Sequence, residues 1–345
     1  MEYVRDINIQ EAVIHVLDKN GEEPILNQYK IELCEDIYKF IYKHIEKCFK
    51  DDELKYAVFN KERSIVKELS KDYLNGIEKD LIGLSQELAR QLFIIMKANA
   101  NIPSCDLLIV SLITDQGPMI GIIKMDYVKS FTHKIDIVGE KVGIDIIQQS
   151  AGLPGENKKV LKAAFIKPIR KNQSYNIMLL DKQKKSKDEE YGSNYFINNF
   201  IGCSLVVNER DMTKAFIEAT EKWTRLNFIE DPGAATEIRN VIKNKLVEEE
   251  TIDIDDLSKE IFKSNGNTAE KFSSFIKNHN LEDKIDIDKE YVEKKLKRIN
   301  FKIDRDIDLY INNEVYNDKE RFEITKNSDG SINMLLKNIS NYIEK

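Results

Sequence analysis

The sequence predicts an α+β fold, in which an N-terminal mixed α/β-sheet domain is followed by a mainly helical part closed by a C-terminal β-hairpin. Three observations support this class. Strand-like apolar runs dominate the chain up to about residue 205, helical spacing of apolar residues begins near Asn208, and strict alternation returns after about residue 300. Because strands and helices gather in separate parts of the chain, the order is typical of an α+β protein.

The N-terminal segment combines strand and helix patterns. A turn at Asn20-Gly21 joins two extended runs and predicts a β-hairpin. Apolar residues recur at helical spacing from Leu33 to Phe49, which predicts an amphipathic helix. The other side of this helix carries Lys39, Lys43 and Lys47. The elements expected before residue 100 are strands over 8–18, 24–33 and 56–59 and helices over 33–49, 61–74 and 78–99.

Continuous apolar runs over 105–149 predict the core sheet of the first domain. They are CDLLIVSLITD, a turn at Gln116-Gly117-Pro118, MIGIIKMDY and a more polar SFTHKIDIV. Two further strands are expected over 160–169 and 175–181. The run SNYFINNFIGC then places Tyr195, Phe196, Phe200 and Ile201 on one helical face that ends at Gly202, and we expect this helix to pack in the core.

The C-terminal part changes to helical spacing and then back to alternation. Asn267 and Glu270 have the spacing of a capping box, and Asn327-Ser328-Asp329-Gly330 predicts the turn of a hairpin. Helices are expected over 209–228, 232–249, 255–263, 267–279 and 288–299. We therefore predict an α+β domain over 1–205, a helical region over 206–299, and a C-terminal β-hairpin over 300–345 that packs on the helical region.

The composition is typical of a globular protein of the cytoplasm. Hydrophobic residues make up 41% and charged residues 33% of the 345 residues, and the net charge is -7. No apolar run approaches the length of a membrane span, and the N-terminus lacks the apolar stretch of a secretory signal. The four widely spaced cysteines, Cys34, Cys48, Cys105 and Cys203, are expected to be reduced. Since the chain is acidic overall, any DNA contact must be local.

Motifs of catalysis and cofactor binding are scarce. The sequence contains no phosphate-binding glycine loop, no HExxH motif and no GxSxG elbow. We therefore expect no cofactor, no metal and no enzymatic activity. One alternative stays open, because Glu156 and Lys158 match the ExK fragment of metal-dependent nucleases, with Asp145 as an upstream carboxylate.

The strongest local feature is the basic segment from Lys158 to Lys187. It contains ten basic residues and one acidic residue, Asp181, and its net charge is +9. Clustered basic residues suit phosphate contacts, although a solvated surface would have the same composition. The predicted DNA-binding residues are Lys158, Lys159, Lys162, Lys167, Arg170, Lys171, Lys182, Lys184, Lys185 and Lys187.

Several segments, in order along nearly the whole chain, resemble the bacterial nucleoid-associated protein family. They are IQEAVIHVL, DLLIVSLITDQGPMIGIIKM, SNYFINNFIGC, IRNVIKNKLVEEETIDIDDLSKEIF and FKIDRDIDLYINNEVYNDKERFEITKNSDGSINMLLKNI. The resemblance implies association with the nucleoid, DNA binding and a link to chromosome topology, and it carries over no catalytic or DNA-contacting residue. A protein-interaction scaffold for a topoisomerase, another chromosome-associated protein or a defence complex remains an alternative, as does a homo-oligomer.

Overall fold

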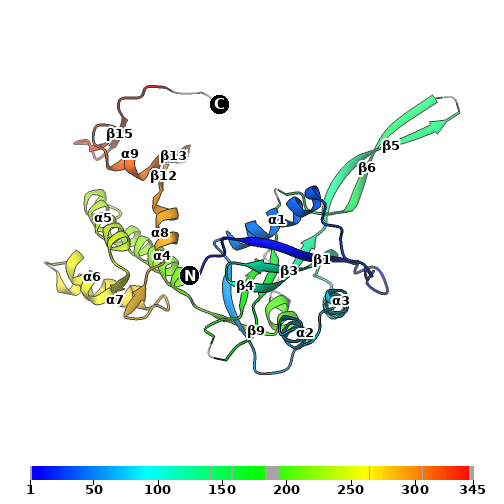
Figure 1. Ribbon diagram of the computed structural model, residues 1–345. Coiled ribbons are helices and arrows are strands. Elements are labelled where there is room, and N and C mark those ends of the chain that lie inside the picture. Colours follow the sequence, from blue (N-terminus) through cyan, green and yellow to red (C-terminus); the bar gives the residue numbers. More distant parts are fainter. Residues whose placement is uncertain are drawn as a thin grey trace. The chain divides into compact units, whose positions relative to one another are not determined.

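The computed structural model consists of two compact units, Glu2–Val207 and Asn208–Lys345, which are described separately. The residues that the structure describes are 2–139, 141–156, 158–171, 173–182, 194–263, 265–304 and 306–341. Figure 1 shows the elements of both units.

The first unit is built on a seven-stranded antiparallel sheet with the strand order β1-β3-β4-β7-β8-β2-β9. Its strands are β1 (Ile7–Leu17), β2 (Lys55–Phe59), β3 (Cys105–Thr114), β4 (Gly117–Asp126), β7 (Lys162–Ile166), β8 (Ile177–Asp181) and β9 (Cys203–Val206). Its helices are α1 (Glu35–Phe49), α2 (Ile65–Leu74), α3 (Leu81–Ala98) and the π-helix η1 (Tyr195–Ile201).

Helices cover both faces of this sheet, as Figure 1 shows, with α1 on one face and α2, α3 and η1 on the other. This explains why the central strands β3 and β4 are buried at most positions and mainly apolar, because a strand that is covered on both faces does not alternate regularly with polar residues. On the α1 side, the Phe49 ring lies 4.2 Å from the Phe165 ring.

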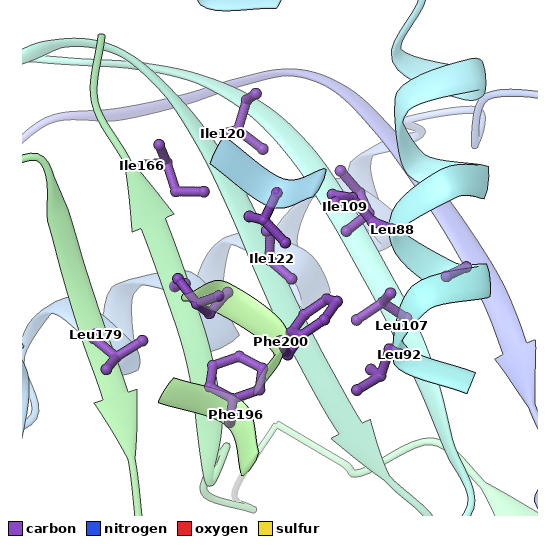
Figure 2. Close-up of a cluster of buried hydrophobic side chains, with 14 of the residues drawn as sticks. Leu88, Leu92, Leu107, Ile109, Ile120, Ile122, Ile166, Leu179, Phe196 and Phe200 are labelled. Atoms are coloured by element: carbon purple, nitrogen blue, oxygen red, sulfur yellow. The ribbon is translucent and has the colours of Figure 1, made fainter. Parts of the chain in front are cut away.

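The larger core lies between the sheet and the layer of α2, α3 and η1 (Figure 2). Leu88 and Leu92 of α3 and Phe196 and Phe200 of η1 point toward the sheet, and all four are buried. The prediction that the SNYFINNFIGC run packs through one face is therefore confirmed. Helix η1 ends at Gly202, which has a φ of 72°, because a residue with a side chain would be strained in this conformation.

The predicted N-terminal hairpin is wrong. A turn does form after Leu17, where the Gly21 amide donates to the Asp18 carbonyl at 2.9 Å. However, the second run forms no strand. Its backbone bonds to β1 at the bridge between Val16 and Ile25 and through the Ile31 amide, which donates to the Ala12 carbonyl at 2.8 Å, whereas β1 pairs along its whole length with β3. Pairing with β3 occupies the opposite edge of β1, and Pro24, at the start of the second run, has no backbone donor.

The predicted core sheet is also too large. Its last, more polar run forms β5 (Val128–Val138), which pairs only with β6 (Lys141–Gly152) in a separate two-stranded sheet. Figure 1 shows this ribbon extending away from the seven-stranded sheet. The core sheet therefore ends, along this part of the chain, at Asp126.

The second unit is a helical assembly with short strands. Its elements are α4 (Glu209–Asn227), α5 (Pro232–Glu248), β10 (Thr251–Asp253), α6 (Ile254–Ile261), α7 (Gly266–Lys277), β11 (Lys284–Asp286), α8 (Lys289–Leu296), β12 (Arg298–Ile303), β13 (Ile307–Asn312), α9 (Asn313–Asn317), β14 (Phe322–Lys326) and β15 (Ile332–Leu336). Trp223 is central to its core, where its ring lies 4.9 Å from Phe272 and 5.2 Å from Phe262. No helix among the described residues is long and apolar enough to span a membrane.

Side-chain caps explain where the helices of this unit begin. Asn208 accepts from the Asp211 amide at 3.0 Å, which fixes the start of α4 at the point where the sequence periodicity changes. Helix α7 begins earlier than predicted, because Asn265, and not Asn267, is its cap and accepts from the Thr268 amide at 3.1 Å. The C-terminal segment forms two hairpins, β12–β13 and β14–β15, the second of which contains the predicted turn at Gly330.

Candidate nucleic-acid interface

The structure divides the predicted basic segment between two ends of the sheet. Lys158 and Lys159 precede β7, whereas Arg170 and Lys171 follow it in the connection to β8. Since β8 runs antiparallel to β7, Lys182 returns to the end where β7 begins, and its amide donates to the Leu161 carbonyl at 2.8 Å. The ten residues therefore do not form one continuous patch among the described residues. Lys184, Lys185 and Lys187 lie outside the described residues.

The side chains of Lys162 and Lys182 are mostly buried, and each is paired with an aspartate. Lys162 forms an ion pair with Asp181, and its Nζ lies 5.0 Å from the centre of the Tyr195 ring. Burial raises the pKa of Asp181, and the ion pair with Lys162 opposes that shift. Lys182 Nζ lies 2.6 Å from Asp51 Oδ2. These two lysines hold the strand ends together, so their charges are largely unavailable to phosphates.

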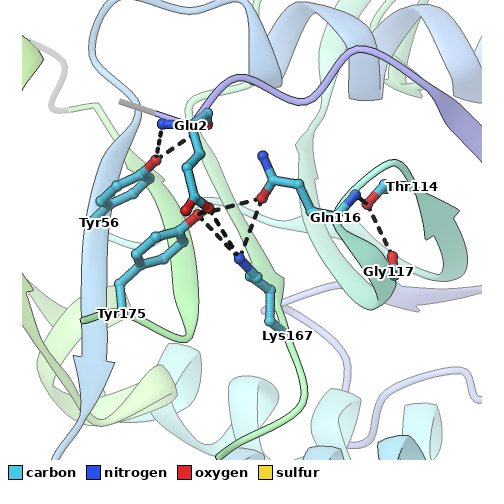
Figure 3. A network of polar contacts seen from close by, with 7 residues as sticks. All are labelled: Glu2, Tyr56, Thr114, Gln116, Gly117, Lys167 and Tyr175. Carbon is cyan, nitrogen blue, oxygen red and sulfur yellow. Dashed lines mark hydrogen bonds and ion pairs between the residues drawn. The ribbon is translucent and has the colours of Figure 1, made fainter. Parts of the chain in front are cut away.

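Lys167 belongs to a structural network at the opposite end of the sheet (Figure 3). Its Nζ lies 3.5 Å from Glu2 Oε2, donates to Gln116 Oε1 at 3.3 Å and lies 4.4 Å from the centre of the Tyr175 ring. Tyr175 donates to Glu2, and this bond and the Lys167 charge lower the pKa of the Glu2 carboxyl group. The network attaches the N-terminal segment to the sheet, and it keeps Lys167 away from solvent.

Lys158 and Lys159 are exposed. The loop that carries them is attached to α1 through Glu156, because Lys43 forms an ion pair with the Glu156 carboxylate and Lys47 donates to its backbone carbonyl. Lys39, Lys43 and Lys47 are spaced four residues apart, so they form a row on one side of the helix with steps of about 6 Å. We call Lys39, Lys43, Lys47, Lys158 and Lys159 the lysine patch.

The buried side of α1 fixes the position of this row. His44 is fully buried between the lysine turns, and its Nε2 donates to the Pro154 carbonyl at 3.1 Å. Burial lowers the pKa of the His44 imidazole, so the ring stays neutral and adds no charge to the patch. The bond from His44 to Pro154 and the contacts of Glu156 together hold the loop against the helix.

The electrostatics of Glu156 show that the patch is positively charged. The hydrogen bond from Lys43, together with the charges of Lys43, Lys39 and Lys47, holds the pKa of this carboxyl group below its usual value. Several ammonium groups therefore act at one exposed point of the surface. An external anion at that point would meet the same field, apart from the opposing charge of Glu156 itself.

Arg170 and Lys171 are exposed but stand apart from the lysine patch. They lie in the connection between β7 and β8, at the opposite end of β7 from Lys158 and Lys159. Four residues that share a short segment of sequence thus belong to two different parts of the surface.

The carboxylates of the nuclease alternative are not brought together. Asp145 lies in the ribbon opposite Lys134, about 23 Å of extended strand away from Gly152, at which β6 ends. Glu156 is engaged by Lys43. No group of three or more His, Cys, Asp or Glu residues among those the structure describes could hold a metal ion.

The cysteines differ in their surroundings. Cys48, Cys105 and Cys203 are buried, and burial raises the pKa of each of these thiols to about 12. Cys34 is exposed and is the residue that precedes the first turn of α1.

Part of the lysine patch can be recognised in the sequence, from the i, i+4 spacing of Lys39, Lys43 and Lys47. This row was expected on the solvent side of the helix, but no pattern in the sequence connects it with Lys158 and Lys159, which follow more than a hundred residues later. The connection depends on how α1 packs on the sheet.

An antiparallel sheet covered by helices on both faces, followed by a unit of capped helices and short hairpins, defines a two-unit α+β protein with an exposed basic surface. The chain belongs to the family of nucleoid-associated protein YejK, whose family model matches residues 13–344. The resemblance to nucleoid-associated proteins is therefore confirmed over nearly the whole sequence. No curated protein matches the chain.

Proposed function

We propose that the protein binds DNA directly and without strong sequence specificity, through the lysine patch. The observation that carries this proposal is the convergence of Lys39, Lys43 and Lys47 on Glu156, in the loop that continues to Lys158 and Lys159. Membership in a nucleoid-associated family supports DNA as the polyanion. Of the ten basic residues predicted to bind DNA, Lys158 and Lys159 are the two that belong to the lysine patch.

The side chains of the patch suit phosphates rather than bases. Lysine ammonium groups act as point charges, and a protein that neutralises phosphates in this way binds through the release of counterions. The five residues of the patch are all lysines, which have neither the fork of arginine nor the amide group that reads base edges in a groove. We therefore expect similar affinity for duplexes of different sequence and a strong dependence on salt.

The experiment compares two double charge reversals within the same segment. Lys158→Glu with Lys159→Glu should weaken duplex binding at least tenfold at about 100 mM salt, and should reduce the slope of log affinity against log salt by about 1.8. Arg170→Glu with Lys171→Glu makes the same change in net charge at the other end of β7, and should change affinity less than about threefold. Fluorescence anisotropy with a labelled duplex at several salt concentrations measures both quantities.

Equal losses in the two double variants would show that only net charge matters, and would remove the lysine patch as the site. A wild-type protein that binds no duplex at any salt concentration would favour the alternative function, a scaffold that binds a topoisomerase or another chromosome-associated protein.

Removing the Glu156 charge should strengthen DNA binding. Glu156→Gln takes a carboxylate out of the centre of the patch and releases Lys43 from its ion pair, so we expect affinity to rise about two- to fivefold at low salt. Glu11→Gln is the matched control, because Glu11 also pairs with a lysine, Lys30 at 2.7 Å, but lies on β1. An unchanged or lower affinity of Glu156→Gln would contradict a phosphate site at this point.

A further inference from the structure

The ribbon formed by β5 and β6 pairs with no strand of the seven-stranded sheet. Its register places His133 opposite Ile146, Ile135 opposite Ile144 and Ile137 opposite Val142. Because residues that face each other across a strand pair share one face, and because successive residues alternate between faces, the two faces can be assigned from this register.

One face of the ribbon is apolar and exposed. Besides His133 and Gln148, it carries six large apolar side chains whose residues are each between 57% and 74% exposed: Phe131, Ile135, Ile137, Val142, Ile144 and Ile146. The opposite face carries Thr132, Lys134, Asp136, Asp145 and Ile147. The ribbon is therefore amphipathic, and its apolar face has no cover among the described residues of its own unit.

The area of this face is that of a protein interface. Each fully exposed large apolar side chain offers on the order of 150–200 Å², so two-thirds of six such side chains amount to roughly 600–800 Å². The largest apolar patch on a typical monomer is about 300–600 Å², whereas each partner of a stable interface contributes about 800 Å². A two-stranded ribbon is also only marginally stable in water by itself, which favours a partner that covers it.

The charges of the ribbon favour a second copy of this chain over a nucleic acid. On the polar face, Lys134 stands opposite Asp145 and lies 3.0 Å from Asp136, so positive charge does not accumulate there. On the apolar face, Ile135 and Ile137 of β5 and Ile144 and Ile146 of β6 form a purely apolar surface that can pack against an identical one, as an interface with twofold symmetry requires. Two such faces can pack at about 10 Å, as two β-sheets do.

We propose that the β5–β6 ribbon is a self-association site, and that two copies of the chain form a symmetric dimer by packing the apolar faces of their ribbons together. Phe131, Ile135, Ile137, Val142, Ile144 and Ile146 of both copies are buried in this dimer. This proposal does not depend on DNA binding. Each dimer therefore presents two lysine patches.

The test changes the same residue type on either face of the ribbon. A triple variant, Ile135→Thr, Ile144→Thr and Ile146→Thr, keeps β-branched side chains that suit strands but removes apolar area from the proposed interface. The control is Ile147→Thr, on the opposite face of the same strand. Sedimentation velocity over a range of concentrations should show a wild-type dimer, a dimer dissociation constant at least about 100-fold higher in the triple variant, and a change below about threefold in the control.

A second measurement needs no variant. In the wild-type protein, hydrogen exchange of the amides over 131–137 and 142–148 should slow as the protein concentration rises through the dimer dissociation constant. This result keeps the proposal testable if the triple variant fails to fold.

Three outcomes would overturn the proposal. A wild-type chain that stays monomeric up to about 100 μM excludes a stable dimer. An unchanged dissociation constant in a folded triple variant places the dimer contact elsewhere. A monomer that co-sediments with vesicles of phosphatidylcholine and phosphatidylglycerol, and loses this binding in the triple variant, assigns the apolar face to a lipid surface.

Discussion

Replacing Phe200 with alanine should lower the free energy of unfolding of the Glu2–Val207 unit by about 3–5 kcal/mol. Phe200 is fully buried, and its ring lies 5.5 Å from the ring of Phe196 in the core beneath η1 (Figure 2). The loss combines the transfer of a large apolar side chain to water with a cavity that the sheet can fill only partly. Urea unfolding followed by circular dichroism measures this change.

The matched control for this substitution lies one residue earlier. Asn199→Ala changes an exposed position of the same π-helix and should alter the free energy of unfolding by less than about 0.5 kcal/mol. A loss below about 1 kcal/mol for Phe200→Ala would mean that η1 separates from the sheet at little cost, which contradicts its role in the core.

Acid should destabilise the same unit through His15. This imidazole is fully buried; its Nδ1 accepts from the Asn27 amide at 3.0 Å, and its Nε2 donates to Ser85 Oγ at 2.8 Å. Burial, aided by the charge of Arg90, lowers the pKa of His15 to about 4. A proton on Nδ1 would also break the bond from Asn27, which reinforces the neutral form.

The loss of stability in acid follows from the difference in the pKa of His15 between the unfolded and the folded chain. In the unfolded chain the imidazole takes up a proton near pH 6.5, whereas the folded chain resists protonation until about pH 4. The stability that His15 contributes is therefore complete above pH 6.5 and is lost progressively as the pH falls to 4, by about 3 kcal/mol.

Two measurements check this prediction. Between pH 7 and pH 4, the free energy of unfolding should fall by about 3 kcal/mol more in the wild-type protein than in His15→Gln. The variant is expected to be less stable than wild type at pH 7. An NMR titration of the His15 ring should have its midpoint near pH 4. A midpoint near 6.5 would show that the ring is accessible to water in the folded protein.

The parts of the fold that were predictable from the sequence are those in which local pattern and burial agree. The runs that form β3, β4, β7 and β8 are apolar because both faces of the sheet are covered, and α4 begins at Asn208, where the sequence periodicity changes. In contrast, β1 pairs with a strand whose residues lie 88 to 107 positions further along the chain, from Leu17↔Cys105 to Ile7↔Thr114. Local sequence patterns do not indicate such a long-range pairing, so the turn at Asn20-Gly21 favours the nearest run as the partner of β1.

The ribbon was assigned to the core because an amphipathic strand looks the same whether its apolar face meets its own core or another molecule. Ile135 and Ile144 alternate with polar neighbours, as residues of a core strand do. For the candidate DNA site, composition indicates Lys158 and Lys159 but does not separate them from Lys162 and Lys182. The latter two are paired with aspartates, and these pairs depend on how β7 pairs with β8 and on where the loop after α1 lies.

The position of Cys34 provides a native attachment point for a fluorescent probe. Maleimide dyes react with accessible thiolates, and the other three cysteines are buried with a pKa raised to about 12, so labelling at neutral pH is directed to a single side chain. Because Cys34 immediately precedes α1, the dye sits at the beginning of the helix that carries Lys39, Lys43 and Lys47. The wild-type sequence can thus be followed by single-molecule imaging on stretched DNA without any engineered residue.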